Sequence, residues 1–331
     1  CVEYNGTGLS ILEMSHRSSH FVAVMEKAQA LVKEVLGVPD GYQVLFLQGG
    51  ASLGFYISAL NFMKEGGKGA YLNTGTWSKS AIKEAKKIGK VDVVASSEES
   101  NFKYVPKGYT VPSDADYFHI TTNNTIFGTQ MHQLPDSKVP LIADMSSDIF
   151  SKVIDVSKFD LIYAGAQKNM GPAGTTVYIV KEEMLGKTGR DLPSMLDIQV
   201  HIAKESMFNT PPVFPIYVSM LNLEWLKEFG GVKAIEARND AKAALLYDEV
   251  DRNPLFEGVA EKEDRSKMNP TFVLTDESLT DKWNGLWNAA GISGIIGHRS
   301  VGGYRASMYN ALPLESVQVL VDCMKELERT A

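Results

Sequence analysis

Residues 160–180 constrain the fold of this chain more than any other stretch. Two apolar runs, 161–164 and 175–180, are rich in β-branched and aromatic residues and predict two short buried strands. The turn between them contains three glycines, a proline and a single lysine, Lys168. Glycine allows unusual backbone angles and the close approach of a ligand, and a desolvated lysine at such a position is suited to forming a Schiff base. The alternative is a lysine that only keeps an exposed loop soluble.

A carboxylate, Asp144, is predicted to lie close to Lys168. Residues 139–144 form another apolar run, and Asp144 falls where the predicted strand ends. Ligands of open α/β sheets bind at the carboxyl ends of the strands, so we expect the amine and the carboxylate in one crevice. Pyridoxal phosphate needs such a pair, a lysine for its aldehyde and a carboxylate that keeps its pyridine nitrogen protonated. A salt bridge between Asp144 and Lys168 is the alternative.

Apolar strands alternate with helical or loop connections from residue 42 to residue 164, which predicts an α/β fold with a mostly parallel sheet. These strands are predicted at 42–48, 70–73, 91–95, 117–122, 139–144 and 161–164. Helical patterns at 216–229 and 232–250 follow, and then a smaller α/β unit with a strand near 268–274 and helices near 278–290 and 314–328. The glycine pair 230–231 is the predicted boundary between a large cofactor-binding domain, 1–230, and a small C-terminal domain, 231–331.

Composition is ordinary for a globular protein and restricts its partners. The net charge is −7 without a basic tail or stripe, which argues against nucleic acid and anionic membrane surfaces. No apolar run of the sequence approaches the length of a membrane span. Cys1 and Cys323 match no zinc or disulfide spacing, so we expect a cytoplasmic protein without a metal site. Because the chain opens with Cys1 rather than methionine, we expect its natural start to be missing.

Further segments carry residues that can contact a ligand. The glycine-rich turn 49–54 follows a strand and opens a helix, so its amides can cradle a phosphate; steric reasons alone also make such turns glycine-rich. Trp77, after the strand 70–73, is placed to stack on a planar ring or to pack between helices. His298, Arg299 and Arg305 lie within eight residues of one glycine-rich segment, which favours recognition of two anionic groups.

Seven motifs together resemble one family. The chain is similar, in order and over essentially its whole length, to the phosphoserine aminotransferases, which are class V enzymes dependent on pyridoxal phosphate. The matching segments are 15–17, 49–51, 124–126, 144–148, 165–169, 209–212 and 297–307. The resemblance implies the fold type I of these transferases, with helices on both faces of a central sheet. It also implies a homodimer whose two active sites lie at the subunit interface.

The resemblance assigns most of the matched residues to the cofactor. Lys168 would carry the cofactor and Asp144 would be the partner of its pyridine nitrogen, while Trp77 would stack on the ring and Thr125 would contact the ring hydroxyl. The cofactor phosphate would be bound by residues of both subunits, namely Gly50, Ala51, Ser52 and Gln167 with Asn209 and Thr210 of the partner subunit. Because Ser52 stands where some relatives carry arginine, we expect backbone amides and hydroxyl groups to make more of the contacts to the cofactor phosphate.

The resemblance also implies the substrates. Phosphoserine and 2-oxoglutarate would exchange an amino group to give 3-phosphohydroxypyruvate and glutamate in serine biosynthesis. Whether 4-phosphohydroxythreonine of vitamin B6 synthesis is a second substrate stays open. Arg305 would hold the substrate α-carboxylate. The substrate phosphate, or the side-chain carboxylate of glutamate, would bind two His-Arg pairs, His298 and Arg299 together with His16 and Arg17 of the other subunit.

Three alternatives stay open. Two are enzymes that use the same cofactor, an alanine–glyoxylate aminotransferase and a cysteine desulfurase. The desulfurase is disfavoured because Cys1 and Cys323 lie at the two ends of the chain. The third is a binding protein that kept the fold and lost the activity, and an intact pair of Lys168 and Asp144 argues against it.

Overall fold

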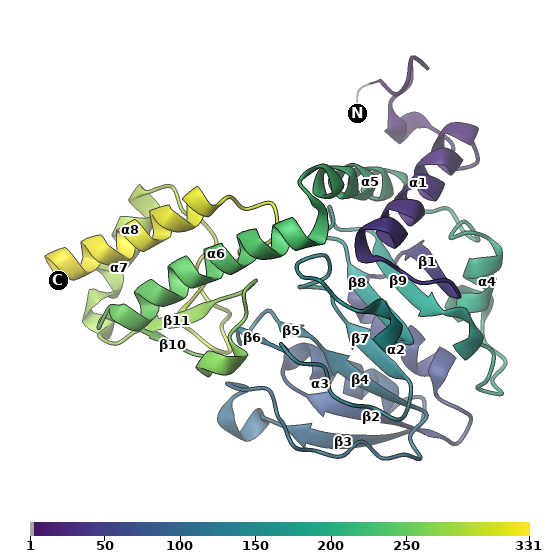
Figure 1. Ribbon diagram of the computed structural model, residues 1–331, viewed down its shortest axis with the longest axis horizontal. Helices are drawn as coiled ribbons and strands as arrows, with labels where there is room; N and C mark the ends of the chain where they lie inside the picture. Colours follow the sequence, from purple (N-terminus) through teal and green to yellow (C-terminus); the bar gives the residue numbers. More distant parts are fainter. Residues whose placement is uncertain (1–2) are drawn as a thin grey trace.

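A seven-stranded sheet forms the centre of the computed structural model, which describes residues 3–331 (Figure 1). The strand order is β1-β9-β8-β7-β4-β2-β3. Strand β9 pairs antiparallel with both β1 and β8, whereas the other neighbours pair in parallel, so the sheet is mostly parallel as predicted. The strands are β1 (Tyr42–Leu47), β2 (Lys68–Asn73), β3 (Lys90–Ser96), β4 (Tyr117–Thr121), β7 (Leu141–Asp144), β8 (Leu161–Gly165) and β9 (Thr176–Lys181).

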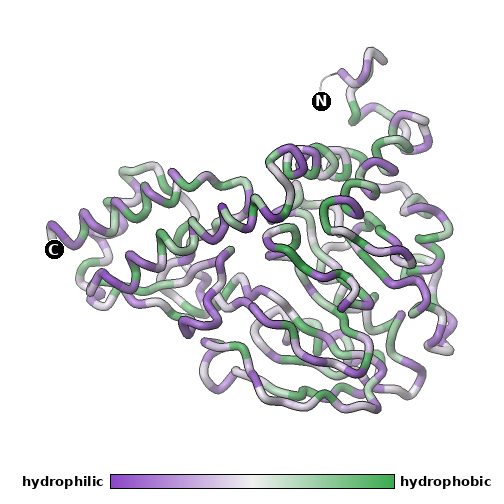
Figure 2. The backbone as a smooth tube through the Cα atoms, viewed as in Figure 1, coloured by the Kyte–Doolittle hydropathy of each residue, from purple (hydrophilic) through white to green (hydrophobic). Residues whose placement is uncertain are grey.

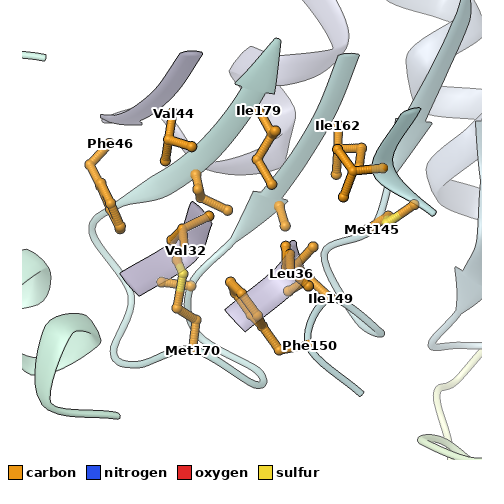
Figure 3. Close-up of a cluster of buried hydrophobic side chains, with 14 of the residues drawn as sticks. Val32, Leu36, Val44, Phe46, Met145, Ile149, Phe150, Ile162, Met170 and Ile179 are labelled. Atoms are coloured by element: carbon orange, nitrogen blue, oxygen red, sulfur yellow. The ribbon is translucent and has the colours of Figure 1, made fainter. Parts of the chain in front are cut away.

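Helices cover both faces of this sheet, because its central strands are apolar on both sides. Helices α1 (Ser19–Leu36) and α5 (Val213–Glu228) cover one face, and α2 (Gly50–Phe62), α3 (Thr76–Ala85) and α4 (Ile198–Ala203) cover the other. Alternate residues of each strand serve opposite faces. Figure 3 shows the core on the α1 side, where strand residues meet that helix and the loops below the sheet; it labels Val32, Leu36, Val44, Phe46, Met145, Ile149, Phe150, Ile162, Met170 and Ile179.

A second, three-stranded antiparallel sheet lies in the C-terminal part and has a core of its own. Its order is β10 (Phe256–Gly258), β11 (Thr271–Leu274) and β12 (Tyr304–Arg305). Helices α6 (Gly231–Arg252), α7 (Thr280–Ala289) and α8 (Leu314–Thr330) pack on it. Figure 2 shows hydrophilic and hydrophobic residues alternating along α6 and α8, as expected for helices with one buried face.

Helix α6 leads from the large sheet to the small one (Figure 1). Its N-cap is Gly230 in the left-handed region, with φ of 109°, so the chain turns sharply at the predicted boundary. The division into domains 1–230 and 231–331 stays a prediction. Among residues 3–331 no helix is both long enough and apolar enough to cross a bilayer.

Several local elements differ from the sequence prediction. Helix α5 begins at Val213 rather than at residue 216, because Pro215 lies in the first turn, where its missing N–H is not needed. A two-stranded hairpin, β5 (Asn123–Asn124) and β6 (Thr129–Gln130), and the short helix α4 were not predicted. Short 3₁₀ helices lie at Ile11–Glu13, Glu98–Ser100, Val156–Lys158, Glu182–Met184, Ser194–Leu196, Lys262–Asp264 and Glu277–Leu279.

Candidate functional site

The ends of five strands meet at one edge of the large sheet. Asp144, the last residue of β7, is in register with Thr121 of β4 and with Tyr163 of β8. Two residues further along β8, Gly165 is in register with Thr176 of β9, which in turn faces the last residue of β1. The loop that carries Lys168 therefore leaves the sheet beside Asp144. This edge is where ligands of open α/β sheets bind.

Lys168 lies in the loop between β8 and β9, and its amine points into the protein. The loop is fixed by backbone bonds, since the amides of Met170 and Gly171 both donate to the carbonyl of Ala166. The Lys168 Nζ donates to the Thr125 Oγ1 at 2.8 Å. Burial lowers the pKa of Lys168, although the nearby carboxylates oppose this effect. Such an amine is easier to deprotonate than an exposed lysine, as a nucleophile or a base requires.

Asp144 is buried at the strand end, with a side chain held by the turn that follows. Its Oδ1 accepts a hydrogen bond from the Ser146 amide at 2.9 Å. Burial raises the pKa of Asp144, while the bonds from Ser146 and the charge of Lys168 act in the opposite direction. Within residues 3–331 no lysine or arginine forms an ion pair with this carboxylate, so a salt bridge to Lys168 does not describe the pair.

Thr125 joins Lys168 to a residue of the C-terminal sheet. It lies in the turn of the β5–β6 hairpin, and its carbonyl accepts a hydrogen bond from the Arg305 Nη1 at 3.3 Å. Arg305 is part of β12, so the contact brings together segments 43 and 180 positions away from Thr125. The Arg305 Nε is buried and has no partner among the described residues. Thr125 therefore accepts hydrogen bonds from the Lys168 amine, through its Oγ1, and from the Arg305 guanidinium, through its carbonyl.

Trp77 lies beside the same hairpin. It is the second residue of α3, and the glycine before that helix touches the hairpin closely, since a Cβ on Gly75 would lie 2.7 Å from the Asn124 Oδ1. The indole packs with Phe127 and neighbouring apolar side chains, yet its Nε1 is buried without a partner in residues 3–331. One face of the hairpin is thus aromatic.

The start of α2 offers backbone donors at the same edge. Gly49 and Gly50 have φ of 95° and 64°, and the first amide to bond within the helix is that of Leu53, which donates to the Gly49 carbonyl at 3.2 Å. The amides of Gly50, Ala51 and Ser52 precede that bond, as at any helix N-terminus. A Cβ on Gly49 would lie 2.5 Å from Leu53, so the turn requires glycine.

Asn209 and Thr210 lie close to this helix start in the same chain. The Asn209 Nδ2 donates to the Gln48 Oε1 at 2.5 Å, and the Gln48 Nε2 donates to the Thr210 carbonyl at 2.8 Å. Gln167, from the Lys168 loop, lies against Gly165, where a Cβ would be 2.6 Å from its Oε1. The residues predicted for the cofactor phosphate therefore surround the ends of β1 and β8.

The two predicted His-Arg pairs lie in different places. His298 and Arg299 are exposed on a loop before β12, and the His298 Nδ1 is 2.7 Å from the Ser300 Oγ. Val301 of that loop packs against the aromatic cluster that contains Trp77, so the loop borders the site. His16 and Arg17 lie in the turn before α1, and within residues 3–331 neither side chain bonds to another predicted site residue.

Sequence reasoning missed several buried polar residues beside the site. Asp148 accepts hydrogen bonds from the Thr122 hydroxyl and, at 3.2 Å, from the Gln130 Nε2, and its charge raises the pKa of Lys168. Asn269 and Tyr309 also line the hairpin. Asp148 lies in the segment 144–148 that resembles the family, whereas no sequence pattern marks Asn269 or Tyr309.

Comparison with known proteins identifies the family. The sequence model described as Aminotransferase class-V matches residues 2–320. The chain belongs to the class-V aminotransferase family. This class-V aminotransferase is 66% identical over 328 residues to the phosphoserine aminotransferase of Flavobacterium psychrophilum, an alignment that covers 99% of the chain and 92% of the relative.

Solved structures agree with the family assignment. A phosphoserine aminotransferase from Bacillus circulans subsp. alkalophilus superposes with a TM-score of 0.95 at 45% identity and covers 99% of this class-V aminotransferase and 92% of that chain. A pyridoxal-phosphate-bound phosphoserine aminotransferase from Trichomonas vaginalis has a TM-score of 0.93 at 36% identity, over 98% and 93% of the two chains. The predicted fold type is therefore confirmed.

Proposed function

We propose that this chain is a phosphoserine aminotransferase that uses pyridoxal 5′-phosphate. The reaction exchanges the amino group between 3-phosphoserine with 2-oxoglutarate and 3-phosphohydroxypyruvate with glutamate, a step of serine biosynthesis. One observation carries the proposal. Lys168 and Arg305 both donate hydrogen bonds to Thr125, and the buried carboxylate Asp144 lies nearby. The relatives that match over the full length of the chain are phosphoserine aminotransferases. We propose 4-phosphohydroxythreonine as a second substrate of the same pocket.

Groups of this chain fit the cofactor. Asp144 is a buried carboxylate without a cationic ion-pair partner in residues 3–331, and a protonated pyridine nitrogen would offset the cost of burying it. The Trp77 indole, whose Nε1 is an unpartnered donor, suits one face of the ring. Thr125 would contact the ring hydroxyl. The phosphate would be held at the start of α2 and by the neighbouring loops, through Gly50, Ala51, Ser52 and Gln167 with Asn209 and Thr210 of the partner subunit.

Lys168 would move the proton. When bound, pyridoxal phosphate supplies an electron sink for the carbanion that forms at the substrate α-carbon. The lowered pKa of Lys168 favours the neutral amine, which can accept the α-proton as a general base. Thr125 holds the amine before reaction, through its Oγ1 at 2.8 Å. Asp144 would hold a proton on the pyridine nitrogen, since a carboxylate buried beside that nitrogen favours its charged form.

The cationic residues would select the substrate. Arg305, whose Nη1 is already directed at the Thr125 carbonyl, lies next to Lys168 and would hold the α-carboxylate. His298 and Arg299, on the loop that borders the Trp77 cluster, would bind the phosphate of phosphoserine or the distal carboxylate of glutamate. His16 and Arg17 would complete that pocket from the other subunit of a homodimer. We further propose a cytoplasmic location and the division into domains at residue 230.

Half-reaction spectra test the proposal. The full-length enzyme loaded with pyridoxal phosphate is mixed with phosphoserine, serine or alanine in the absence of a keto acid, and the change in the cofactor spectrum is followed. A charge-assisted hydrogen bond contributes roughly 1.5–3 kcal/mol, so two of them predict a preference for phosphoserine of roughly 10²-fold or more. Arg299→Ala should reduce the preference for phosphoserine over serine, whereas Arg305→Ala should weaken both substrates.

A surface arginine provides the matched control. Arg329→Ala, which removes an exposed arginine of α8 bonded to Glu326, should leave the preference unchanged. Equal rates with serine and phosphoserine in the wild type would contradict the substrate assignment and leave an aminotransferase of another specificity. No spectral change with any amino acid would contradict the activity itself.

A further inference from the structure

Gly54 marks a very close contact between helix α2 and the large sheet. A Cβ on Gly54 would lie 2.6, 2.9 and 3.1 Å from the Cδ2, Cε2 and Cγ atoms of Tyr163 in β8. Carbon atoms in contact are normally about 3.5–4.0 Å apart, so no larger residue fits between the helix and this ring. Gly54 lies inside α2 and its φ is not positive, so the backbone itself does not require glycine. Only the approach of α2 to Tyr163 requires it.

The ring of Tyr163 is held firmly beneath the helix. It is fully buried, and its hydroxyl oxygen is 2.7 Å from the His119 Nε2. Burial lowers the pKa of His119 to about 3 and raises the pKa of Tyr163, so both rings stay neutral and keep this bond. The imidazole of His119 stacks on Tyr71, whose hydroxyl is 2.6 Å from that of Tyr117. A larger residue at position 54 would therefore displace α2 rather than the ring.

Tyr163 is also fixed relative to the carboxylate and the lysine of the site. Its Cα is in register with that of Asp144 in β7, and its carbonyl accepts a hydrogen bond from the Met145 amide at 3.0 Å. Strand β8 ends two residues later, at Gly165, and the loop that carries Lys168 follows. These contacts are made by the backbone, so they do not depend on the identity of the side chain at position 163.

We propose that Gly54 and Tyr163 are positioning residues, which set the distance from the amides at the start of α2 to Asp144 and Lys168. Gly54 lies about one helical turn after Gly50, so a shift of the helix at Gly54 also moves those amides. A ligand that binds both parts of the site has a fixed length and cannot follow such a shift. The inference rests on the part of the proposed function that places the cofactor phosphate at the start of α2.

Gly54→Ala tests this role through cofactor binding. The full-length enzyme is freed of cofactor and titrated with pyridoxal phosphate or with pyridoxal, and formation of the Schiff base is followed by absorbance. Pyridoxal lacks only the phosphate, so it uses Lys168 and Asp144 without the start of α2. The Kd of pyridoxal phosphate should rise by about 10- to 100-fold, as for the loss of one charge-assisted hydrogen bond, whereas the Kd of pyridoxal should not change.

A second substitution should rescue the first. Tyr163→Val in the Gly54→Ala background removes Cδ2 and Cε2, the two ring atoms closest to the new Cβ, so α2 can return toward the sheet. The affinity for pyridoxal phosphate should recover by about 10-fold relative to Gly54→Ala, because the two side chains are in contact. Tyr163→Val alone should weaken pyridoxal phosphate and not pyridoxal, since α2 loses its support, and it provides the test if Gly54→Ala does not fold.

A second helical glycine is the matched control. Gly285 lies inside α7 and is exposed, and a Cβ there would meet no heavy atom within 4 Å among the described residues. Gly285→Ala makes the same change of side chain in a helix of the other sheet. It should leave the dissociation constants of both ligands unchanged. Circular dichroism shows which variants are folded.

The outcomes separate this inference from the proposed function. In folded Gly54→Ala, an unchanged Kd of pyridoxal phosphate, or an equal loss for both ligands, would overturn the positioning role. A double variant that binds no better than Gly54→Ala would overturn it as well. A wild type that binds pyridoxal phosphate far more tightly than pyridoxal, yet shows no half-reaction with any amino acid, would overturn the proposed activity and leave the positioning role in place.

Discussion

Lys242 provides a test of how the C-terminal part of the molecule is held together, because its ammonium group is fully buried in α6. The Nζ donates to the carbonyls of Met308 and Tyr309 at 2.9 and 2.8 Å, and among residues 3–331 it forms no ion pair with a carboxylate. Burial, aided by the positive charge of Arg238, lowers its pKa from 10.5 to about 7. The perturbation that we consider is Lys242→Met, which keeps an unbranched side chain of similar length.

Two opposing effects follow from this substitution. The two carbonyls lose their donor, which costs about 1–3 kcal/mol for each group left unsatisfied. The wild type, in turn, carries a burial cost for the ammonium of up to about 5 kcal/mol, because one pKa unit corresponds to about 1.4 kcal/mol. That cost is complete below the folded-state pKa of about 7 and absent above the unfolded value of 10.5, so wild-type stability rises with pH between the two.

The pH dependence isolates the burial term, since the loss of hydrogen bonds does not depend on pH. Urea unfolding of both proteins should show the free energy of unfolding of the wild type, relative to Lys242→Met, rising by about 2 kcal/mol from pH 7 to about pH 9. The control is Lys233→Met, an exposed lysine of the same helix, which should show no such trend. A difference between wild type and Lys242→Met that is constant over this range would refute the burial argument.

Three further predictions concern the site. Borohydride reduction of the loaded enzyme should attach the cofactor to Lys168 and to no other lysine in the peptide map, and Lys168→Ala should still bind cofactor but lose turnover by several orders of magnitude, roughly 10³-fold or more. Mixed Lys168→Ala and Arg17→Ala chains should recover part of the activity through hybrid dimers; proven subunit exchange without recovery would argue against shared sites. Gly49→Ala should weaken binding of pyridoxal phosphate and lower the melting temperature, since the new Cβ would lie 2.5 Å from Leu53; binding equal to wild type by calorimetry would contradict the cradle.

The large sheet could be predicted because its signals are local. Each strand is an uninterrupted apolar run between turn residues, and the observed limits of β1, β4 and β8 lie within one residue of the predicted ones. The direction of β9 could not be predicted, because the loop 166–175 allows either a hairpin or a crossover. Strand β9 runs antiparallel to both β8 and β1, and its pairing with β1 joins residues far apart in the chain.

The residues of the site also fall into those that the sequence predicts and those that it does not. Lys168 and Asp144 follow apolar strands directly, so their common position follows from the geometry of parallel sheets. The polar network that supports them has no such signal. Asn123 and Asn269 are 146 positions apart, and Asn239 and Asn310 are 71 apart, yet each pair is joined by a buried hydrogen bond. In the sequence, an asparagine outside a helical or strand pattern is as typical of an exposed loop as of a buried hydrogen bond between distant segments.

The proposed dimer places a geometric demand on Gln48. In this chain Asn209 and Thr210 bond to Gln48, which adjoins its own α2 start. The proposal requires the same two residues to reach the α2 start of the partner subunit. In a two-fold dimer, a residue that touches both its own site and the equivalent site of the partner lies near the symmetry axis. The two phosphate cradles must therefore face each other across an axis close to Gln48. In that arrangement the hybrid of Lys168→Ala and Arg17→Ala chains restores activity only when Arg17 enters the partner's site, whereas an Asn209 substitution in place of Arg17 would test the origin of Asn209 in the same way.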